Sequence, residues 1–290
     1  MKVKIRIGNE VKEYTGAWED HTLLEVFQEL GITQVHAPCG GNGTCKKCLV
    51  TVEGLGEVLS CQTQCKDGMC VTVAEEQKSA IAENGNCYLY PADAGEGLLA
   101  ACDIGTTTVV CHLLDGATGV RLCTVSAPNA QRSFGADVIS RIQASVDSGL
   151  DKLQSAIVDQ INGMLVQLKQ KAGRTEDIRR LAVAGNTVMS HLFCGLSPKS
   201  IGVAPFTPLS LFGESYDAKQ IGIEGCETVY VVPSIAGYVG GDIVADLAAV
   251  QMHSSVLAED GEKETLMLDI GTNGEMVLGK SGSYVCCATA

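Results

Sequence analysis

The sequence predicts an α+β protein in which a small β-grasp domain precedes an α/β lobe of the ribonuclease-H-like kind and the start of a second such lobe. Three observations carry this prediction. Apolar residues alternate near the N-terminus, a loop rich in glycine and cysteine follows, and the string Asp-Ile-Gly-Thr occurs twice, at Asp103 and at Asp269. We expect residues 1–75 to form the β-grasp domain, 76–97 a linker, 98–258 the first lobe and 259–290 the beginning of the second, incomplete lobe.

Composition and charge narrow the class of function. The chain has 290 residues and a formal net charge of −13. Nucleic acids and anionic membranes attract basic surfaces, so this charge argues against both as the main partner. The sequence has no apolar run long enough to span a bilayer, and its start lacks the apolar core of a signal peptide. We therefore expect a cytoplasmic protein.

The 14 cysteines need an explanation other than disulfides, because the cytosol keeps thiols reduced. Cysteines in apolar, strand-like runs are expected to be small core residues. Those between residues 39 and 70 are different, because they are dense and begin in a glycine-rich loop. So much cysteine also favours an oxygen-poor habitat.

The elements of the β-grasp domain follow from short-range patterns. The alternation of Val3 to Ile7 and a strand at Val11 to Tyr14 predict a hairpin. His21-Thr22 precedes apolar residues at helical spacing, and this helix is expected to end at Gly31. Further strands are expected at Leu49 to Val52 and at Met69 to Val73.

The loop after this helix has the spacing Cys39-x5-Cys45-x2-Cys48. A 2Fe–2S cluster needs four thiolates that converge on two irons, and glycines let the backbone wrap around it. Structural zinc sites usually show two separate Cys-x2-Cys pairs, and only one occurs here. The fourth ligand is open between Cys61 and Cys65. The segment LSCQ resembles the apolar-x-Cys-Gln segment of 2Fe–2S ferredoxins, which favours Cys61.

From residue 98 onward the expected order is three strands, helix, strand, helix, strand and helix, which is typical of the ribonuclease-H-like fold. The three-strand pattern then restarts near residue 265. The expected strands are 99–104, 107–114, 120–126, 181–184, 229–232, 265–270, 274–278 and 283–287, and the expected helical segments are 134–145, 150–171, 187–193 and 242–252.

Each Asp-Ile-Gly-Thr string lies between two expected strands. A tight turn there directs N–H groups at phosphate oxygens. Asp103 and Asp269 are placed to hold Mg²⁺ through water, and the metal would neutralise charge on the phosphates. The expected phosphate contacts are Gly105, Thr106, Thr107, Thr108, Gly271, Thr272 and Asn273.

Two more turns lie between these strings. Gly240 and Gly241 lead into a helix whose N-terminus can face phosphates. Asp242 either caps this helix or orients an attacking water molecule. Asn186 is equally compatible with a helix cap and with a contact to phosphate or substrate.

Taken in order, seven motifs resemble the reductive activators of corrinoid proteins. They are CGGNGTCKKC, LSCQ, DIGTTT, GADVISRI, AGNTVMSHL, IAGYVGGDIVADL and LDIGTNGEM, and they cover nearly the whole chain. These activators are ferredoxin-domain members of the superfamily of acetate and sugar kinases, heat-shock chaperones and actin. The resemblance implies a ferredoxin-like domain and an actin-like ATPase that use ATP to reduce Co(II) of a corrinoid protein to Co(I) for methyl transfer in anaerobic metabolism.

The resemblance also implies site residues and partners. Cys39, Cys45, Cys48 and Cys61 would hold the cluster, and Asp103 to Thr107 and Asp269 to Asn273 would form the phosphate loops. The partners would be a corrinoid protein, an upstream reductant and a second copy in a homodimer. The adenosine-binding glycine motif of the superfamily lies after Ala290, so we expect these residues to bind ATP weakly or not at all. The alternative is a 2Fe–2S electron-transfer protein with a nucleotide-sensing or non-catalytic actin-like domain.

Overall fold

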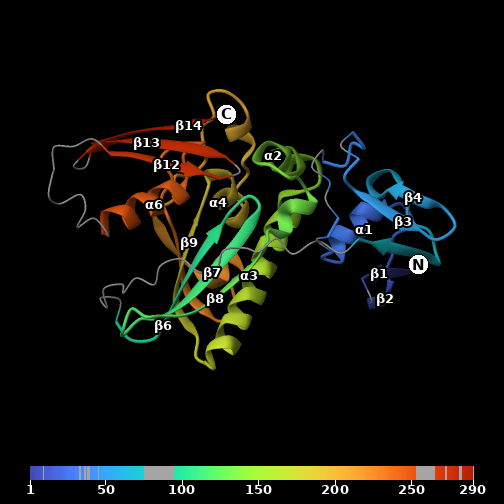
Figure 1. The fold of residues 1–290 in the computed structure, drawn as a ribbon, viewed down its shortest axis with the longest axis horizontal. Helices are drawn as coiled ribbons and strands as arrows, with labels where there is room; N and C mark the ends of the chain where they lie inside the picture. The colour runs from blue at the N-terminus through green and yellow to red at the C-terminus, as the bar shows by residue number, and fades with distance from the viewer. Residues whose placement is uncertain are drawn as a thin grey trace. The chain divides into compact units, whose positions relative to one another are not determined.

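The computed structural model describes residues 1–8, 10–32, 34, 35, 37, 40–44, 46–74, 95–252, 265–271, 273–280 and 283–289 (Figure 1). Cys39, Cys45, Thr272 and most of the expected linker lie outside the described residues. The described residues form two compact units. One contains those up to residue 74 together with Ala130–Gly149, and the other contains the remainder.

The first unit contains a five-stranded sheet in the order β2-β1-β5-β3-β4, in which β1 and β5 are parallel. Helix α1 (Leu23–Glu29) begins at a capping box, where Thr22 N donates to Glu25 Oε2 at 2.7 Å. Its apolar face is buried in the core of this unit. This arrangement confirms the β-grasp prediction. The strands are β1 (Lys2–Ile7), β2 (Glu10–Thr15), β3 (Leu49–Val52), β4 (Gly56–Leu59) and β5 (Met69–Val73).

The second unit is built on a six-stranded sheet in the order β10-β11-β9-β6-β7-β8. Strands β6, β7 and β8 form an antiparallel meander, and β9 and β11 continue the sheet parallel to β6. This order and these directions confirm the ribonuclease-H-like fold. The strands are β6 (Leu98–Ile104), β7 (Thr108–Asp115), β8 (Arg121–Pro128), β9 (Ile178–Gly185), β10 (Glu214–Asp217) and β11 (Cys226–Val231).

Helices cover this sheet. The longest, α3 (Leu150–Ala172), contacts β7 and β8 through buried residues at helical spacing, among them Ile157, Ile161 and Leu168. Helix α6 (Gly241–Met252) contacts β9. The shorter helical segments of this unit are α4 (Thr187–Phe193), α5 (Ala218–Ile221) and the 3₁₀ turn η3 (Lys199–Gly202).

The expected helix at 134–145 is wrong at its start. A 3₁₀ turn, η2 (Ala130–Ser133), comes first, and α2 spans Val138–Asp147. Asp137 sets the boundary, because its carboxylate accepts the Ser140 N–H at 2.8 Å as the N-cap. In the first unit, Gln28 Nε2 donates to Ser133 O at 2.8 Å and connects η2 to α1.

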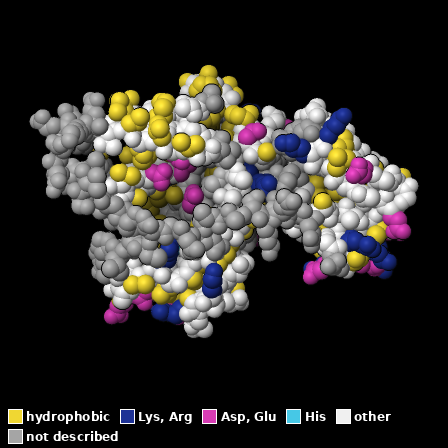
Figure 2. Space-filling view, viewed as in Figure 1, with side chains coloured by type: hydrophobic (Ala, Val, Ile, Leu, Met, Phe, Trp, Pro, Cys, Tyr) yellow, Lys and Arg dark blue, Asp and Glu magenta, His cyan; other side chains and the backbone are white. Residues whose placement is uncertain are grey.

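A three-stranded antiparallel sheet follows in the second unit. Its strands are β12 (Thr265–Ile270), β13 (Gly274–Lys280) and β14 (Ser283–Thr289). One face packs on Val239 and Ile243. The other face exposes apolar side chains, among them Leu266 and Leu268, and Figure 2 shows hydrophobic side chains gathered over this sheet. The two faces therefore differ in exposure, because the first is covered by α6 and the turn before it and the second is open to solvent.

Within the described ranges, no helix is both long enough and apolar enough to cross a bilayer.

Candidate functional site

Two of the expected cluster ligands are described, and they lie side by side. Cys48 precedes β3, and Cys61 is in the 3₁₀ turn η1 (Ser60–Gln62). Both residues are buried, and their Sγ atoms are 3.2 Å apart. Two thiolates on one tetrahedral metal, with bonds of about 2.3 Å, lie roughly 3.8 Å apart. The two sulfurs are therefore close enough for both to reach one metal ion after a small separation.

Cys65 is the rival for the fourth ligand position. It is also buried, and its N–H donates to His21 O at 2.8 Å. In the described part of the chain, no other cysteine sulfur lies within hydrogen-bonding distance of its own. The geometry therefore favours Cys61 as the partner of Cys48.

The glycine loop next to Cys61 supplies N–H donors. Gly41 and Gly43 adopt φ angles of 92° and 74°, which glycine alone adopts without strain. The Gly43 N–H donates to the Cys61 sulfur, as does Gln62 Nε2 at 3.6 Å. Such donors stabilise charge on ligating sulfurs, so this environment fits a cluster thiolate.

Without a metal, burial raises the pKa of the Cys61 thiol, and the neighbouring Cys48 raises it further. The donors from Gln62 and Gly43 act in the opposite direction. A bound metal would hold both sulfurs as thiolates, because metal binding and thiol deprotonation are coupled.

The first Asp-Ile-Gly-Thr turn connects β6 to β7. A Cβ atom on Gly105 would lie 2.7 Å from Thr108 O, so the turn needs glycine at this position. Asn129 supports the turn twice, because its Nδ2 donates to Gly105 O at 2.7 Å and its N–H donates to Thr107 O at 2.9 Å. Asn129 is fully buried, and its role was not expected from the sequence.

Asn186 connects this turn to helix α4. Its Oδ1 accepts the Met189 N–H at 3.0 Å, so it is the N-cap of the helix. Its Nδ2 donates to Thr106 Oγ1 at 3.1 Å. Asn186 therefore has a capping role and also fixes a hydroxyl of the expected phosphate loop.

The glycine-rich turn before α6 packs against the same helix. A Cβ atom on Gly240 would lie 2.7 Å from Thr187 N and closer still to Asn186 Cα. A Cβ atom on Gly241 would lie 2.8 Å from Val232 O. Thr187 Oγ1 also donates to Ala236 O at 2.6 Å. Gly240 thus permits the backbone contact that brings the start of α6 to the start of α4, and Gly241 permits a close approach to the backbone after β11.

The second Asp-Ile-Gly-Thr turn connects β12 to β13. The Gly271 N–H donates to Asn273 O at 3.0 Å, which closes the turn, and Thr289 Oγ1 donates to Gly274 O at 2.8 Å. Asp269 lies opposite Glu275 in the register of these strands.

Acidic side chains gather where the two turns and α6 meet, and Figure 2 shows them over the region that α6 and β12 occupy in Figure 1. The Asp103 side chain is accessible to solvent, yet the surrounding protein desolvates it. Desolvation, followed by the charges of Asp242, Asp246 and Asp269, raises the pKa of Asp103 to about 7. The pKa of Glu275 is also raised to about 7, and desolvation is the largest cause.

Helix α6 contributes two of these carboxyl groups. Asp242 lies inside the first turn, where its Oδ1 accepts the Ile243 N–H at 2.9 Å. Its pKa is raised, first by desolvation. Asp246 follows one helical turn later, and desolvation together with Asp269 and Asp242 raises its pKa to about 6.

Sequence reasoning did not include Asp246 or Glu275. The spacing between Asp242 and Asp246 would have placed both on one face of a helix. Within the described residues, no three acidic, cysteine or histidine side chains converge closely enough to hold a metal directly. The like charges of these carboxylates contribute to the rise of one another's pKa values.

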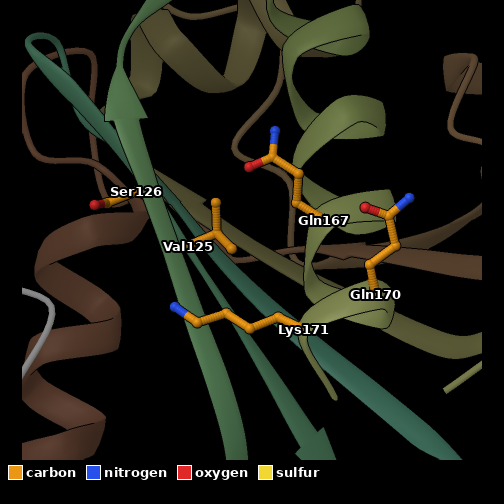
Figure 3. Close-up of a pocket in the computed structure, with 5 residues that line it drawn as sticks. All are labelled: Val125, Ser126, Gln167, Gln170 and Lys171. Atoms are coloured by element: carbon orange, nitrogen blue, oxygen red, sulfur yellow. The ribbon is translucent and has the colours of Figure 1, made fainter. Parts of the chain in front are cut away.

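A separate hollow of about 550 Å³ lies between β8 and α3 (Figure 3). Gln167, Gln170 and Lys171 line it from the helix, and Lys171 extends toward the strand and donates to Thr124 O at 2.9 Å. None of the expected site residues lines this hollow. The hollow is therefore separate from the expected cluster loop and phosphate loops.

Comparison with known proteins agrees with this arrangement. The chain matches the RACo middle region over residues 98–255 and the 2Fe-2S iron-sulfur cluster binding domain over residues 5–76. It is 31% identical to the corrinoid activation enzyme RamQ of Eubacterium limosum, in an alignment that covers 94% of this chain and 58% of RamQ. A solved structure of a reductive activator for a corrinoid, iron-sulfur protein has 28% identity and a TM-score of 0.61, and the match covers 99% of this chain and 63% of that one. The chain thus spans less than two thirds of the length of either relative.

Proposed function

Because the chain belongs to the family of the RACo middle region, which covers residues 98–255, we propose that it is an ATP-dependent reductive activator of a corrinoid protein. One observation carries the proposal above all. A single chain contains the Cys48–Cys61 pair in a ferredoxin-like unit and two Asp-Ile-Gly-Thr turns in a ribonuclease-H-like unit. An electron carrier joined to a phosphate clamp fits an electron transfer that is coupled to nucleotide.

The 2Fe–2S cluster, when bound, supplies a carrier for one electron. Cys48 and Cys61 would hold one iron, and Cys39 and Cys45, which lie outside the described residues, would hold the other. Gly43 and Gln62 would donate to the Cys61 sulfur. The cobalt of the partner gains the electron that the protein loses, so that Co(II) becomes Co(I) and no proton is needed.

The phosphate loops would bind the nucleotide and its metal ion. The N–H groups at Gly105 and Gly271 and the hydroxyls of the neighbouring threonines would bind phosphate oxygens. Asp103 and Asp269 would hold Mg²⁺ through water. The cation would relieve the repulsion that contributes to the raised pKa values of Asp103 and Glu275. Asp242 would orient the attacking water at the start of α6.

Coupling to ATP requires that nucleotide bind two conformations of the protein with different affinity. The contact between Asn186 and Thr106 offers a starting point, because it joins the first phosphate loop to α4. A movement of the phosphate loop on nucleotide binding or hydrolysis would therefore be transmitted through this hydrogen bond to the N-terminus of α4.

The domain boundaries enter the proposal as well. We assign residues 1–75 to the ferredoxin-like domain, 76–97 to a linker and 98–258 to the first lobe. Residues 259–290 belong to a second lobe of the same kind. The meander β12-β13-β14 supports this assignment, because it repeats the connection of β6, β7 and β8 and carries Asp-Ile-Gly-Thr at the same turn. The remaining partners are an upstream reductant and a second copy of the chain, and the compartment is the cytoplasm.

The test is an anaerobic assay with the purified full-length protein, a chemical reductant and a Co(II) corrinoid protein, because residues 1–290 by themselves are expected to bind ATP weakly or not at all. The absorbance of Co(I) is followed with and without Mg·ATP. We expect Co(I) to accumulate only with ATP in the wild-type protein, and much less in Asp103→Asn. Asp159→Asn is the matched control, because this exposed residue of α3 lies outside both loops. Equal Co(I) with and without ATP would favour the alternative, an electron carrier with a nucleotide-sensing or non-catalytic lobe.

A further inference from the structure

We propose that Gln62 is a positioning residue of the cluster site, whose carboxamide joins the Cys61 sulfur to the glycine loop and raises the reduction potential of the bound cluster. This inference rests on the proposed 2Fe–2S function. It adds a residue that is not a ligand but that sets how readily the electron is gained and released.

The hydrogen bonds of Gln62 carry the inference. Gln62 is the last residue of η1, and its Nε2 donates to Gly41 O at 2.8 Å and to the Cys61 sulfur at 3.6 Å. The same nitrogen also donates to Cys61 O at 3.2 Å, so its two N–H groups are shared among three acceptors. One amide group therefore bridges the glycine loop and a candidate ligand.

The glycine loop is shaped around this side chain. A Cβ atom on Gly43 would come within 3.1 Å of Gln62 Cγ and 3.3 Å of Gln62 Cδ. Gly43 has a left-handed φ of 74°, and its backbone N–H lowers the pKa of the Cys61 thiol by hydrogen bonding. The absence of a side chain at Gly43 thus makes room for Gln62 and leaves two donors on one sulfur.

The backbone that carries Gln62 is fixed on both sides. The Ser60 N–H donates to Cys48 O at 2.9 Å, which connects η1 to the other described ligand. Thr63 Oγ1 donates to Leu59 O at 2.9 Å, and Thr63 O accepts the Leu23 N–H at 2.8 Å. Gln62 therefore starts from a backbone that is hydrogen-bonded to Cys48 and to α1 on either side.

The sign of the effect follows from charge. When the cluster gains an electron, negative charge on its thiolates increases, and an N–H donor stabilises the reduced form more than the oxidised form. Removal of the donor lowers the reduction potential. The protein then becomes a stronger reductant for cobalt, but an upstream donor loads it less completely. Because Gln62 is exposed, water replaces part of the lost interaction and keeps the effect modest.

The test compares the reduction potentials of purified wild-type, Gln62→Leu and Gln62→Glu proteins by spectroelectrochemical titration, with Gln64→Leu as the control. Gln64 is also exposed, lies two residues away and makes no hydrogen bond to a cysteine sulfur among the described residues. We expect Gln62→Leu to shift the equilibrium with a redox mediator toward the oxidised protein by roughly threefold to tenfold, where tenfold corresponds to 59 mV for a one-electron couple. Gln62→Glu, which adds a negative charge, is expected to shift it further, and Gln64→Leu is expected to have no effect.

A second readout keeps the test decisive if a variant binds the cluster weakly. The half-time of iron release to a chelator measures how stably the loop retains the cluster. We expect this half-time to be shorter in Gln62→Leu and Gln62→Glu than in the wild type, and unchanged in Gln64→Leu. Unchanged potential and unchanged iron release in both variants would overturn the role of Gln62. Wild-type protein that contains no iron would instead refute the proposed cluster, so the two failures can be told apart.

Discussion

Replacement of Gly240 by alanine tests whether the backbone contact between the start of α6 and the start of α4 is essential to the second unit. The new Cβ atom would lie 2.7 Å from Thr187 N, against an ordinary contact distance of at least 3.4 Å. The backbone would have to move by at least the difference, 0.7 Å, and further to clear Asn186 Cα, which is closer still. Because the atoms that it meets are backbone atoms of the capped first turn of α4, no side-chain rotation relieves the clash.

Overpacking of this kind costs about 1–3 kcal/mol. Alanine is also a poorer residue than glycine directly before a helix, which adds a few tenths of a kcal/mol. For a unit of this size, each kcal/mol lowers the melting temperature by about 2–4 °C. We therefore expect Gly240→Ala to melt several degrees below the wild-type protein.

The assay is thermal unfolding followed by circular dichroism, with Gly163→Ala as the matched control. Gly163 lies inside α3, is exposed, and a Cβ atom there would have no neighbour within 4 Å. The same substitution should therefore stabilise the protein at this position, by about 0.5–1 kcal/mol. Opposite signs for the two variants are the expected result. A Gly240→Ala protein that melts at or above the wild-type temperature would refute the reasoning about this contact.

Three further predictions concern single side chains. Cys61→Ser should abolish the visible absorbance of the cluster and lower its iron content, whereas Cys65→Ser should keep both, and the reverse pattern would assign the fourth ligand to Cys65. Asn186→Ala should destabilise the protein by about 0.5–2 kcal/mol in urea unfolding, because it removes the cap of α4, and an unchanged midpoint would contradict the capping role. Glu275→Gln should remove part of the pH dependence of stability in EDTA. The pKa of Glu275 is raised from 4.5 to about 7, so its ionisation disfavours the folded state, and stability should fall from pH 4.5 to 7 in the wild type and less steeply in the variant.

The sequence predicted the elements that have strong internal patterns. The helix expected at 187–193 and the strands expected at Leu49–Val52 and Met69–Val73 match the observed bounds, because apolar periodicity and turn residues mark both ends. The order of the elements was enough to identify the β-grasp and ribonuclease-H-like folds, since these folds differ in how strands and helices alternate along the chain.

Elements without such patterns were missed. Strand β4 (Gly56–Leu59) is short and half exposed, and β10 (Glu214–Asp217) is a short edge strand without a buried residue. The error at residues 134–145 has a local cause. The hydrophobic pattern reaches back to Phe134, but the carboxylate of Asp137 caps the helix and stops it there.

The sequence predicted only those site residues that lie within short, contiguous motifs. The pairing of Cys48 with Cys61, and the placement of Gln62 on Gly43, depend on how η1 folds back on the glycine loop. The acidic group formed with Asp246 and Glu275 depends on the second unit bringing α6 to β13. Such contacts between distant segments leave no periodic signal in the sequence.

The central claim is that the cluster of this chain delivers its electron to cobalt in an ATP-dependent step. The most direct measurement is a single-turnover experiment in a stopped-flow instrument. Pre-reduced full-length protein, freed of excess reductant, is mixed with a Co(II) corrinoid protein and Mg·ATP, and the absorbance of the oxidised cluster and of Co(I) is recorded together. We predict that the two signals rise with the same rate constant and in a one-to-one ratio, and that neither rises without ATP. Formation of Co(I) without oxidation of the cluster would contradict the account.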